Sequence, residues 1–230
     1  MIFRQLFDTN SSTYTYLIAS RNNGEALLID PVIEHTDRYT QLINELDLNL
    51  VLAVDTHIHA DHITALGQLR ETVGCATAMG EQTNAECVNT HFSDGEKFTL
   101  DGIDIQALYT PGHTDDSYSF LMPDRVLTGD TLLIRGTGRT DFQNGDAGTQ
   151  YDSLFKRLLT LSEHTLVYPG HDYNGMTVST IGEEKNHNPR LKVSGRDAYI
   201  ELMNGLDLDN PRLMDIAVPA NQRCGLDRVA

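Results

Sequence analysis

The feature that most constrains the fold of this chain is a dense run of histidine and aspartate residues after a short apolar segment. Residues 50–54 (LVLAV) have the length and composition of a buried strand. They lead into the motif Thr56-His57-Ile58-His59-Ala60-Asp61-His62. His57 and His59 are two residues apart, so both point to one side of an extended backbone. Imidazole and carboxylate groups at this density suit Zn, Fe or Mn. The motif therefore predicts a metal-binding loop at the end of a strand.

Three later strand-like segments also end in potential metal ligands. Residues 103–108 lead to Thr110-Pro111-Gly112-His113, residues 125–127 lead to Thr128-Gly129-Asp130, and residues 165–168 lead to Pro169-Gly170-His171-Asp172. A single histidine or aspartate after a strand is usually a surface or capping residue, but functional residues also concentrate in such loops. Five of the nine histidines fall in these motifs, so we interpret the four motifs together.

Strand-like segments alternate with single helices twice along the chain, which favours an α+β fold with two sheets and helices outside them. The chain shows no repeat and no linker, so we expect a single domain over residues 1–230, helical and irregular from about residue 175. Apolar patterning predicts helices over 39–46, 63–73 and 151–161. It also predicts strands over 14–18, 26–29, 50–54, 98–100, 103–108, 118–122, 125–127 and 165–168.

The net charge of the chain limits the classes of partner that it can bind. Lys and Arg number 17 against 33 Asp and Glu, which gives a net charge of −16. Nucleic acids and anionic membranes repel such a chain, and no apolar run reaches the length of a membrane span. An anionic small substrate would need a local cluster of Arg or Lys. The three cysteines, an odd number at wide spacing, argue against a disulfide framework and fit a reducing compartment. We therefore expect a cytoplasmic protein.

The four motifs, in this order, resemble the ligand set of the metallo-β-lactamase superfamily, whose fold is an αββα sandwich. The resemblance covers most of the chain. It implies seven potential ligands, which are His57, His59, Asp61, His62, His113, Asp130 and His171. In glyoxalase II-like hydrolases such a set binds two metals, with the aspartate at the position of Asp130 as the bridge. That branch would hydrolyse S-lactoylglutathione with a metal-activated water.

Other segments are more similar to the persulfide dioxygenases, a branch of the same superfamily. These segments are residues 134–143 (IRGTGRTDFQ), 170–173 (GHDY), 188–191 (NPRL) and 218–225 (VPANQRCG). Glyoxalase II usually has Gly-His-Glu-Tyr where this chain has Gly-His-Asp-Tyr. The chain departs from many relatives at Asp55 and at Asp115-Asp116. These segments favour the dioxygenase branch, and the hydrolase branch remains the alternative.

The resemblance to persulfide dioxygenases implies one Fe(II) per chain, held by the residues His57, His113 and Asp130. A set of two histidines and one carboxylate leaves three positions on Fe(II) for substrate and O₂. His59, Asp61, His62 and His171 would then orient these ligands or hold a second metal. The implied reaction oxidises glutathione persulfide with O₂ and water to sulfite and glutathione. The resemblance further implies that Arg139, Tyr173, Arg190 and Asn221 bind the glutathione part, and it allows a homodimer. For Cys224, a buried structural thiol is the expected role.

Overall fold

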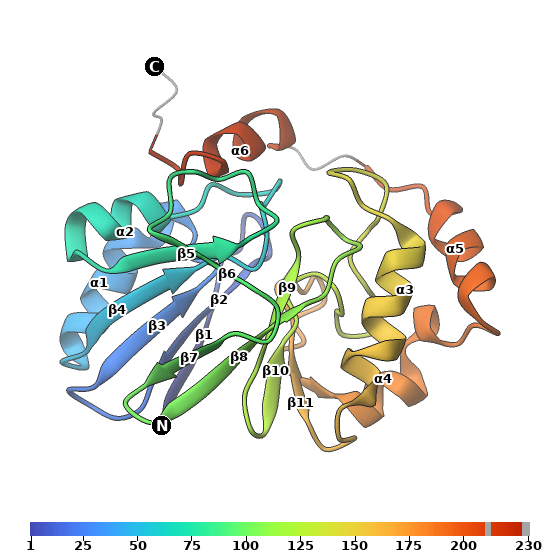
Figure 1. Ribbon diagram of the computed structural model, residues 1–230, viewed down its shortest axis with the longest axis horizontal. Coiled ribbons are helices and arrows are strands. Elements are labelled where there is room, and N and C mark those ends of the chain that lie inside the picture. Colours follow the sequence, from blue (N-terminus) through green and yellow to red (C-terminus); the bar gives the residue numbers. More distant parts are fainter. Residues whose placement is uncertain (210–212, 227–230) are drawn as a thin grey trace. The chain divides into compact units, whose positions relative to one another are not determined.

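The structure is a computed structural model that describes residues 1–209 and 213–226 (Figure 1). The described chain forms two compact units. The first contains residues 1–92, 98–104 and 213–226, and the second contains residues 93–97 and 105–209. Among the described helices, none is both long and apolar enough to cross a membrane.

A six-stranded sheet with the order β1-β2-β3-β4-β5-β6 organises the first unit. Its strands are β1 Ile2–Phe7, β2 Tyr14–Ala19, β3 Glu25–Ile29, β4 Asn49–Val54, β5 Ala76–Gly80 and β6 Thr90–Phe92. β1, β2 and β3 are antiparallel, whereas β3 to β6 run parallel to one another. Parallel neighbours need crossover connections, and helices provide two of them. The helices of this unit are a 3₁₀ turn Ile33–His35, α1 Thr36–Glu45, α2 Leu66–Val73 and α6 Met214–Asn221.

Helix packing in the first unit follows the apolar spacing of each helix. Tyr39 and Ile43, one helical turn apart, are the large buried side chains of α1, and Leu66 and Leu69 are those of α2. α2 packs on β4 and β5, and α1 packs on α2 (Figure 1). Since β3 and β4 are parallel and Ile29 pairs with Val54, the residues that follow both strands emerge at one edge of the sheet. The metal-binding motif begins at that edge.

The second sheet has the order β12-β11-β10-β9-β8-β7. Its strands are β7 Lys97–Leu100, β8 Ile103–Tyr109, β9 Tyr118–Leu121, β10 Arg125–Leu127, β11 Leu166–Tyr168 and β12 Ser179–Thr180. β10 and β11 are parallel, and Leu127 pairs with Tyr168. Asp130 and His171 therefore follow neighbouring strands at the same edge of this sheet.

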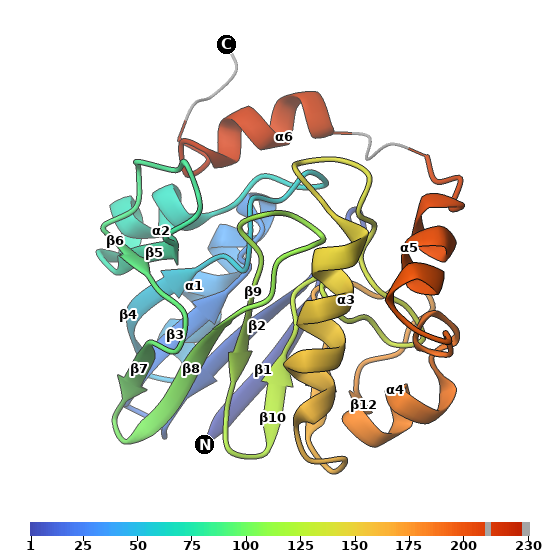
Figure 2. The same cartoon turned by 45° about the vertical axis from the view of Figure 1, so that its right-hand side comes forward.

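The helices of the second unit are α3 Ala147–Lys156, α4 Ile181–His187, α5 Arg196–Asn204 and two 3₁₀ turns, Leu158–Thr160 and Pro189–Leu191. α3 and α5 lie side by side (Figure 2). Leu154 and Leu158 share a buried core with Tyr199 and Met203. This packing fixes α3, which begins beside the His113 loop because Asp146 N–H donates to the carbonyl of Gly112 at 2.9 Å.

All three expected helices differ in extent from the sequence expectation, and the one expected over 39–46 spans Thr36–Glu45. The helix expected over 151–161 begins at Ala147, because the Asp146 side chain accepts a hydrogen bond from Thr149 N–H and caps the helix. The helix expected over 63–73 begins at Leu66, after Thr64 N–H has bonded to a side chain elsewhere in the unit. The short strands β5 and β6 were not among the expected elements, because their residues show no clear alternation.

The expectation that the cysteines are unpaired is wrong. Cys87 and Cys224 form a disulfide across 137 residues of sequence, with Cα atoms 5.9 Å apart, and Cys75 is a free buried thiol. Sequence spacing could not reveal this pair, because it depends on the folded chain bringing the segment after α6 to the segment after β5. The compartment argument drawn from cysteine usage loses its support with it.

Candidate metal centre

The loop after β4 is held by Asp30, which follows β3. Asp30 Oδ1 accepts a hydrogen bond from Thr56 N–H at 2.7 Å, and Asp30 Oδ2 accepts from the Thr56 hydroxyl at 3.0 Å. The Thr56 hydroxyl oxygen lies 2.9 Å from His57 Nδ1. Because the single proton of this hydroxyl goes to Asp30, the oxygen accepts from His57 Nδ1–H. That tautomer places the lone pair of His57 on Nε2, the form that a metal ligand requires.

His59 lies between the same aspartate and the next histidine. Its Nε2 is 3.2 Å from Asp30 Oδ1, and its side chain is fully buried. Burial disfavours the charged ring, but the negative charge of Asp30 and the hydrogen bond to it outweigh burial and raise the pKa of His59 to about 9. Donor atoms of His59, Asp61 and His62 also lie within 4.8 Å of one another, so these residues form a group able to hold a metal ion.

A chain of hydrogen bonds from the connection between β1 and β2 supports the end of this motif. His62 Nδ1 lies 3.0 Å from Asp61 Oδ2 and 3.2 Å from the Thr13 hydroxyl. The Thr13 hydroxyl is 2.7 Å from that of Ser11, which donates to Asp8 at 2.6 Å. Sequence reasoning missed these polar residues and Asp30. Only Asp30 carried a usable signal, since it ends the apolar run 26–29 directly before a proline.

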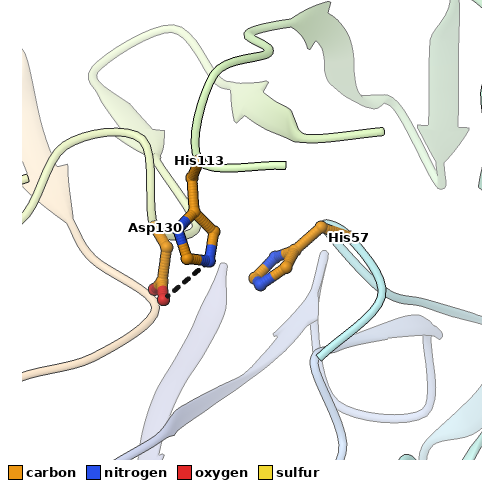
Figure 3. Close-up of side chains that lie close together, drawn as sticks. All are labelled: His57, His113 and Asp130. Atoms are coloured by element: carbon orange, nitrogen blue, oxygen red, sulfur yellow. Dashed lines mark ion pairs between the residues drawn. The ribbon is translucent and has the colours of Figure 1, made fainter. Parts of the chain in front are cut away.

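In the second unit, His113 is oriented by the backbone of the loop that follows β10. His113 Nδ1 lies 2.8 Å from the carbonyl oxygen of Arg139, which can only accept, so Nδ1 carries the proton and Nε2 carries the lone pair. Nε2 is 3.5 Å from Asp130 Oδ2 (Figure 3). Gly138 makes this approach feasible, because a Cβ there would lie 2.3 Å from the Asp130 carbonyl oxygen and 2.7 Å from His113 Nδ1.

His171 is brought to Asp130 by the parallel pairing of β10 and β11. His171 Nδ1 lies 2.7 Å from Asp130 Oδ1, so the two oxygens of Asp130 face two different histidines. Both His171 and Asp130 are buried. The His171 ring also stacks on that of Tyr173 with centroids 6.1 Å apart. In this arrangement His171 holds the carboxylate through one ring nitrogen.

The residues expected to bind glutathione differ in their burial and in their hydrogen-bond partners. Arg139 forms a bidentate interaction with the carboxylate of Asp141, through two hydrogen bonds of 2.6 Å. Arg190 is half-buried and donates through Nη1 to the carbonyl and hydroxyl of Thr137. No carboxylate among the described residues pairs with Arg190, and burial lowers the pKa of its guanidinium. Tyr173 is 71% exposed.

Asn221 is fully buried against the backbone of the metal-binding motif. Its Nδ2 donates to the carbonyls of His59 and His62 at 2.9 and 2.8 Å, and its Oδ1 accepts from Thr64 N–H at 2.8 Å. These three bonds use both protons and the oxygen of the amide. The structure thus places Asn221 beneath the motif, with its amide directed to the protein backbone.

Comparisons with known proteins identify the superfamily and the family of this chain. Residues 8–171 match the model of the metallo-beta-lactamase superfamily, and the chain belongs to that superfamily. Persulfide dioxygenase ETHE1 of Mus musculus is 45% identical and that of Homo sapiens 44% identical, over 98% of this chain and 89% of each relative. Within the superfamily, the chain therefore belongs to the persulfide dioxygenase family.

Solved structures support the same assignment. The crystal structure of ETHE1 from Myxococcus xanthus is 54% identical and matches with a TM-score of 0.94, covering 98% of this chain and 100% of that one. A metallo-beta-lactamase structure from Staphylococcus aureus, at 23% identity and a TM-score of 0.90, covers 97% of this chain and 73% of that one and shares the fold. The expected α+β metallo-β-lactamase fold is confirmed. The family and the imidazole and carboxylate donors together identify a metal-binding protein.

Proposed function

We propose that this chain oxidises glutathione persulfide with O₂ and water to sulfite and glutathione, using one Fe(II) per chain. The observation that carries the proposal is the 44–45% identity to mammalian persulfide dioxygenases along nearly the whole chain. The same observation favours this reaction over thioester hydrolysis of the glyoxalase II type.

The proposed iron ligands are His57, His113 and Asp130 (Figure 3). They offer two imidazole nitrogens and one carboxylate oxygen, which is the donor set typical of non-haem Fe(II) oxygenases. The chemistry of the donors fits, since in both histidines Nδ1 bonds to a protein oxygen and Nε2 remains the basic nitrogen. When bound, such an iron supplies open coordination positions at which a sulfur donor and O₂ can meet.

The remaining residues of the site would keep these ligands in place. Thr56 and the carbonyl of Arg139 fix the two imidazole rings, and His171 fixes the carboxylate of Asp130 through Oδ1. Such supporting hydrogen bonds raise ligand basicity and reduce the freedom of each ligand. Pre-orienting the ligands lets a bound persulfide and O₂ react as neighbours instead of meeting from solution.

Arg190 is the best-supported contact for the glutathione part of the substrate. Glutathione carries two carboxylates, and a chain with a net charge of −16 repels anions unless a cation is placed locally. Arg190 is a desolvated guanidinium without a carboxylate partner among the described residues, so a substrate carboxylate would complete its bonding. Arg139 already carries such a partner, and we assign it to supporting the His113 loop.

The activity is tested by following O₂ uptake with glutathione persulfide beside a thioesterase assay on S-lactoylglutathione, both on iron-loaded protein. We expect O₂ uptake that depends on persulfide, with sulfite as the product. Fast thioester hydrolysis without O₂ uptake would assign the chain to the hydrolase branch instead. In that case the donor group His59, Asp61 and His62 would be expected to hold a second metal.

The location and the assembly of the protein remain predictions. The matched mammalian relatives are named as mitochondrial proteins, whereas the sequence, with no apolar run of membrane-span length and three widely spaced cysteines, led us to expect a cytoplasmic location. Cell fractionation tests the location. Light scattering on the purified protein tests the proposed homodimer.

A further inference from the structure

We propose that Asn221 and the Cys87–Cys224 disulfide form a clamp that sets the backbone of the metal-binding motif, which makes Asn221 a positioning residue of the metal centre. The inference rests on the proposed role of His57, the first histidine of the motif 57–62, as an iron ligand. All the contacts that carry it lie within the first unit.

The first element of the clamp is the amide of Asn221, at the last position of α6. It bridges three backbone groups of the motif, the carbonyls of His59 and His62 and the N–H of Thr64. The residue is fully buried, so losing the amide would remove three hydrogen bonds at a place that water does not reach. One side chain thus ties together both ends of the turn that carries His59, Asp61 and His62.

The second element is a close backbone approach just beyond α6. Gly67 N–H donates to the carbonyl of Cys224 at 2.9 Å. A Cβ at Gly67 would lie 2.6 Å from that carbonyl oxygen, and a Cβ at Gly225 would lie 2.2 Å from the carbonyl oxygen of Thr64. Gly225 also has a φ of 71°, in the left-handed region that favours glycine. The segment 221–225 therefore fits against residues 59–67 only in one close register.

The third element is the disulfide, which holds this segment in that register. Cys224 is completely buried and Cys87 is half-buried, so we expect a small thiol to attack at Cys87 and not at Cys224. A thiolate that attacks Cys87 Sγ breaks the S–S bond, forms a mixed disulfide and releases Cys224 as a thiolate, which takes a proton from solvent. A second thiolate then attacks the mixed disulfide, frees Cys87 and leaves with the first as an oxidised disulfide.

Opening the disulfide should loosen the clamp without unfolding the unit. Asn221 would still hold its three hydrogen bonds, but the chain just beyond it would be free to separate from Cys87. Transient loss of the amide contacts would then free the turn that carries His59 and His62. We expect faster exchange of the Thr64 amide, which reports the bond to Asn221 directly, and faster loss of metal from the motif.

Hydrogen exchange and metal release test the clamp. Dithiothreitol-reduced, alkylated protein and the variant Cys87→Ser should exchange the Thr64 amide about 10–100-fold faster than the oxidised protein, with amides of β9 unchanged. Release of Fe(II) to a ferrous chelator should accelerate by a similar factor.

Asn221→Asp, which turns a carboxylate toward two carbonyls, should have the same effects. Asn186→Asp is the matched control, because Asn186 also donates to a backbone carbonyl but lies at an exposed position of α4.

The two readouts separate failure of the clamp from failure of the proposed reaction. Amide exchange needs neither iron nor substrate, so it tests the clamp even if the protein consumes no O₂. Unchanged Thr64 exchange in reduced protein, with alkylation of both Cys87 and Cys224 confirmed by peptide mass, would overturn the role of the disulfide. Unchanged exchange and metal release in both Cys87→Ser and Asn221→Asp would overturn the clamp as a whole.

Discussion

At the scale of single residues, the proposed metal centre depends on which ring nitrogen of each histidine carries a proton. Thr56 and the Arg139 carbonyl each accept from an Nδ1–H, so His57 and His113 present Nε2. His171 differs from both, because its Nδ1 bonds to the carboxylate of Asp130. Residues of one type and similar burial thus have different expected roles, and substitutions should separate those roles.

We predict that Asp130→Ala abolishes iron binding, whereas His171→Ala retains most of the iron. Asp130 supplies the only negative charge in the proposed set of three ligands, so its loss removes a bond and a neutralising charge. His171 acts through Asp130, and loss of such a supporting group typically lowers affinity or activity about 10–100-fold. Metal analysis of the two purified variants measures the difference. Equal metal loss in both would point to a two-metal site with His171 as a direct ligand.

Arg190→Ala should raise KM for glutathione persulfide with little change in kcat. A charge-assisted hydrogen bond is worth about 1.5–3 kcal/mol, which corresponds to roughly a 10- to 150-fold increase in KM. Arg190→Lys should recover part of the loss, because an ammonium cannot form the two parallel bonds of a guanidinium. Iron content on the same samples distinguishes lost substrate binding from a disturbed loop, since Arg190 also bonds to Thr137. An unchanged KM would mean that glutathione is held elsewhere.

At the scale of elements, the ends of the strands that carry potential metal ligands could be predicted from the sequence. The distant residues that hold the following loops in place could not. Apolar runs followed by His or Asp mark β4, β8, β10 and β11 correctly, because a buried strand and a polar loop have opposite compositions. Parallel pairing then explains why Asp130 meets His171. Asn221 and the disulfide partners lie more than a hundred residues from what they contact. No local pattern encodes such contacts.

Helix α3 offers a test at this scale, because its first turn adjoins the His113 loop. The Asp146 side chain caps α3 by accepting from Thr149 N–H at 2.6 Å. Asp146→Ala should lower the free energy of unfolding by about 0.5–2 kcal/mol, and Asp146→Asn should retain most of the cap. Urea unfolding at pH 7 measures both variants. A loss as large in the asparagine variant as in the alanine variant would rule out capping as the cause.

The same cap should depend on pH. Hydrogen bonds from the side chain and backbone of Thr149 hold the pKa of Asp146 below its ordinary value of 3.8. A carboxylate with a lowered folded-state pKa stabilises the protein above its unfolded-state pKa and loses that contribution as pH falls through the folded-state value. The difference in stability between wild type and Asp146→Ala should therefore be full at neutral pH and shrink in acid. A difference that grows below pH 4 would contradict this assignment.

At the scale of the whole molecule, each unit orients candidate metal ligands with its own residues. In the first unit, His57 lies on a loop held by Asp30 and, as we propose, by the Asn221 clamp. In the second unit, the Arg139 carbonyl orients His113 and His171 orients Asp130. The chain as a whole is strongly acidic, with a net charge of −16, so a local cation such as Arg190 is important for binding an anionic substrate.

The central claim is that one Fe(II) per chain supports persulfide oxidation, and titration of activity against bound metal tests it most directly. Metal-free protein should be loaded anaerobically with increasing Fe(II), and persulfide-dependent O₂ uptake measured at each loading. We predict that the rate rises in proportion to bound iron and stops rising at about one iron per chain, because the proposed site has three protein ligands for a single ion. Activity that appears only as a second metal binds, or equal activity with Zn²⁺ in place of iron, would contradict the account.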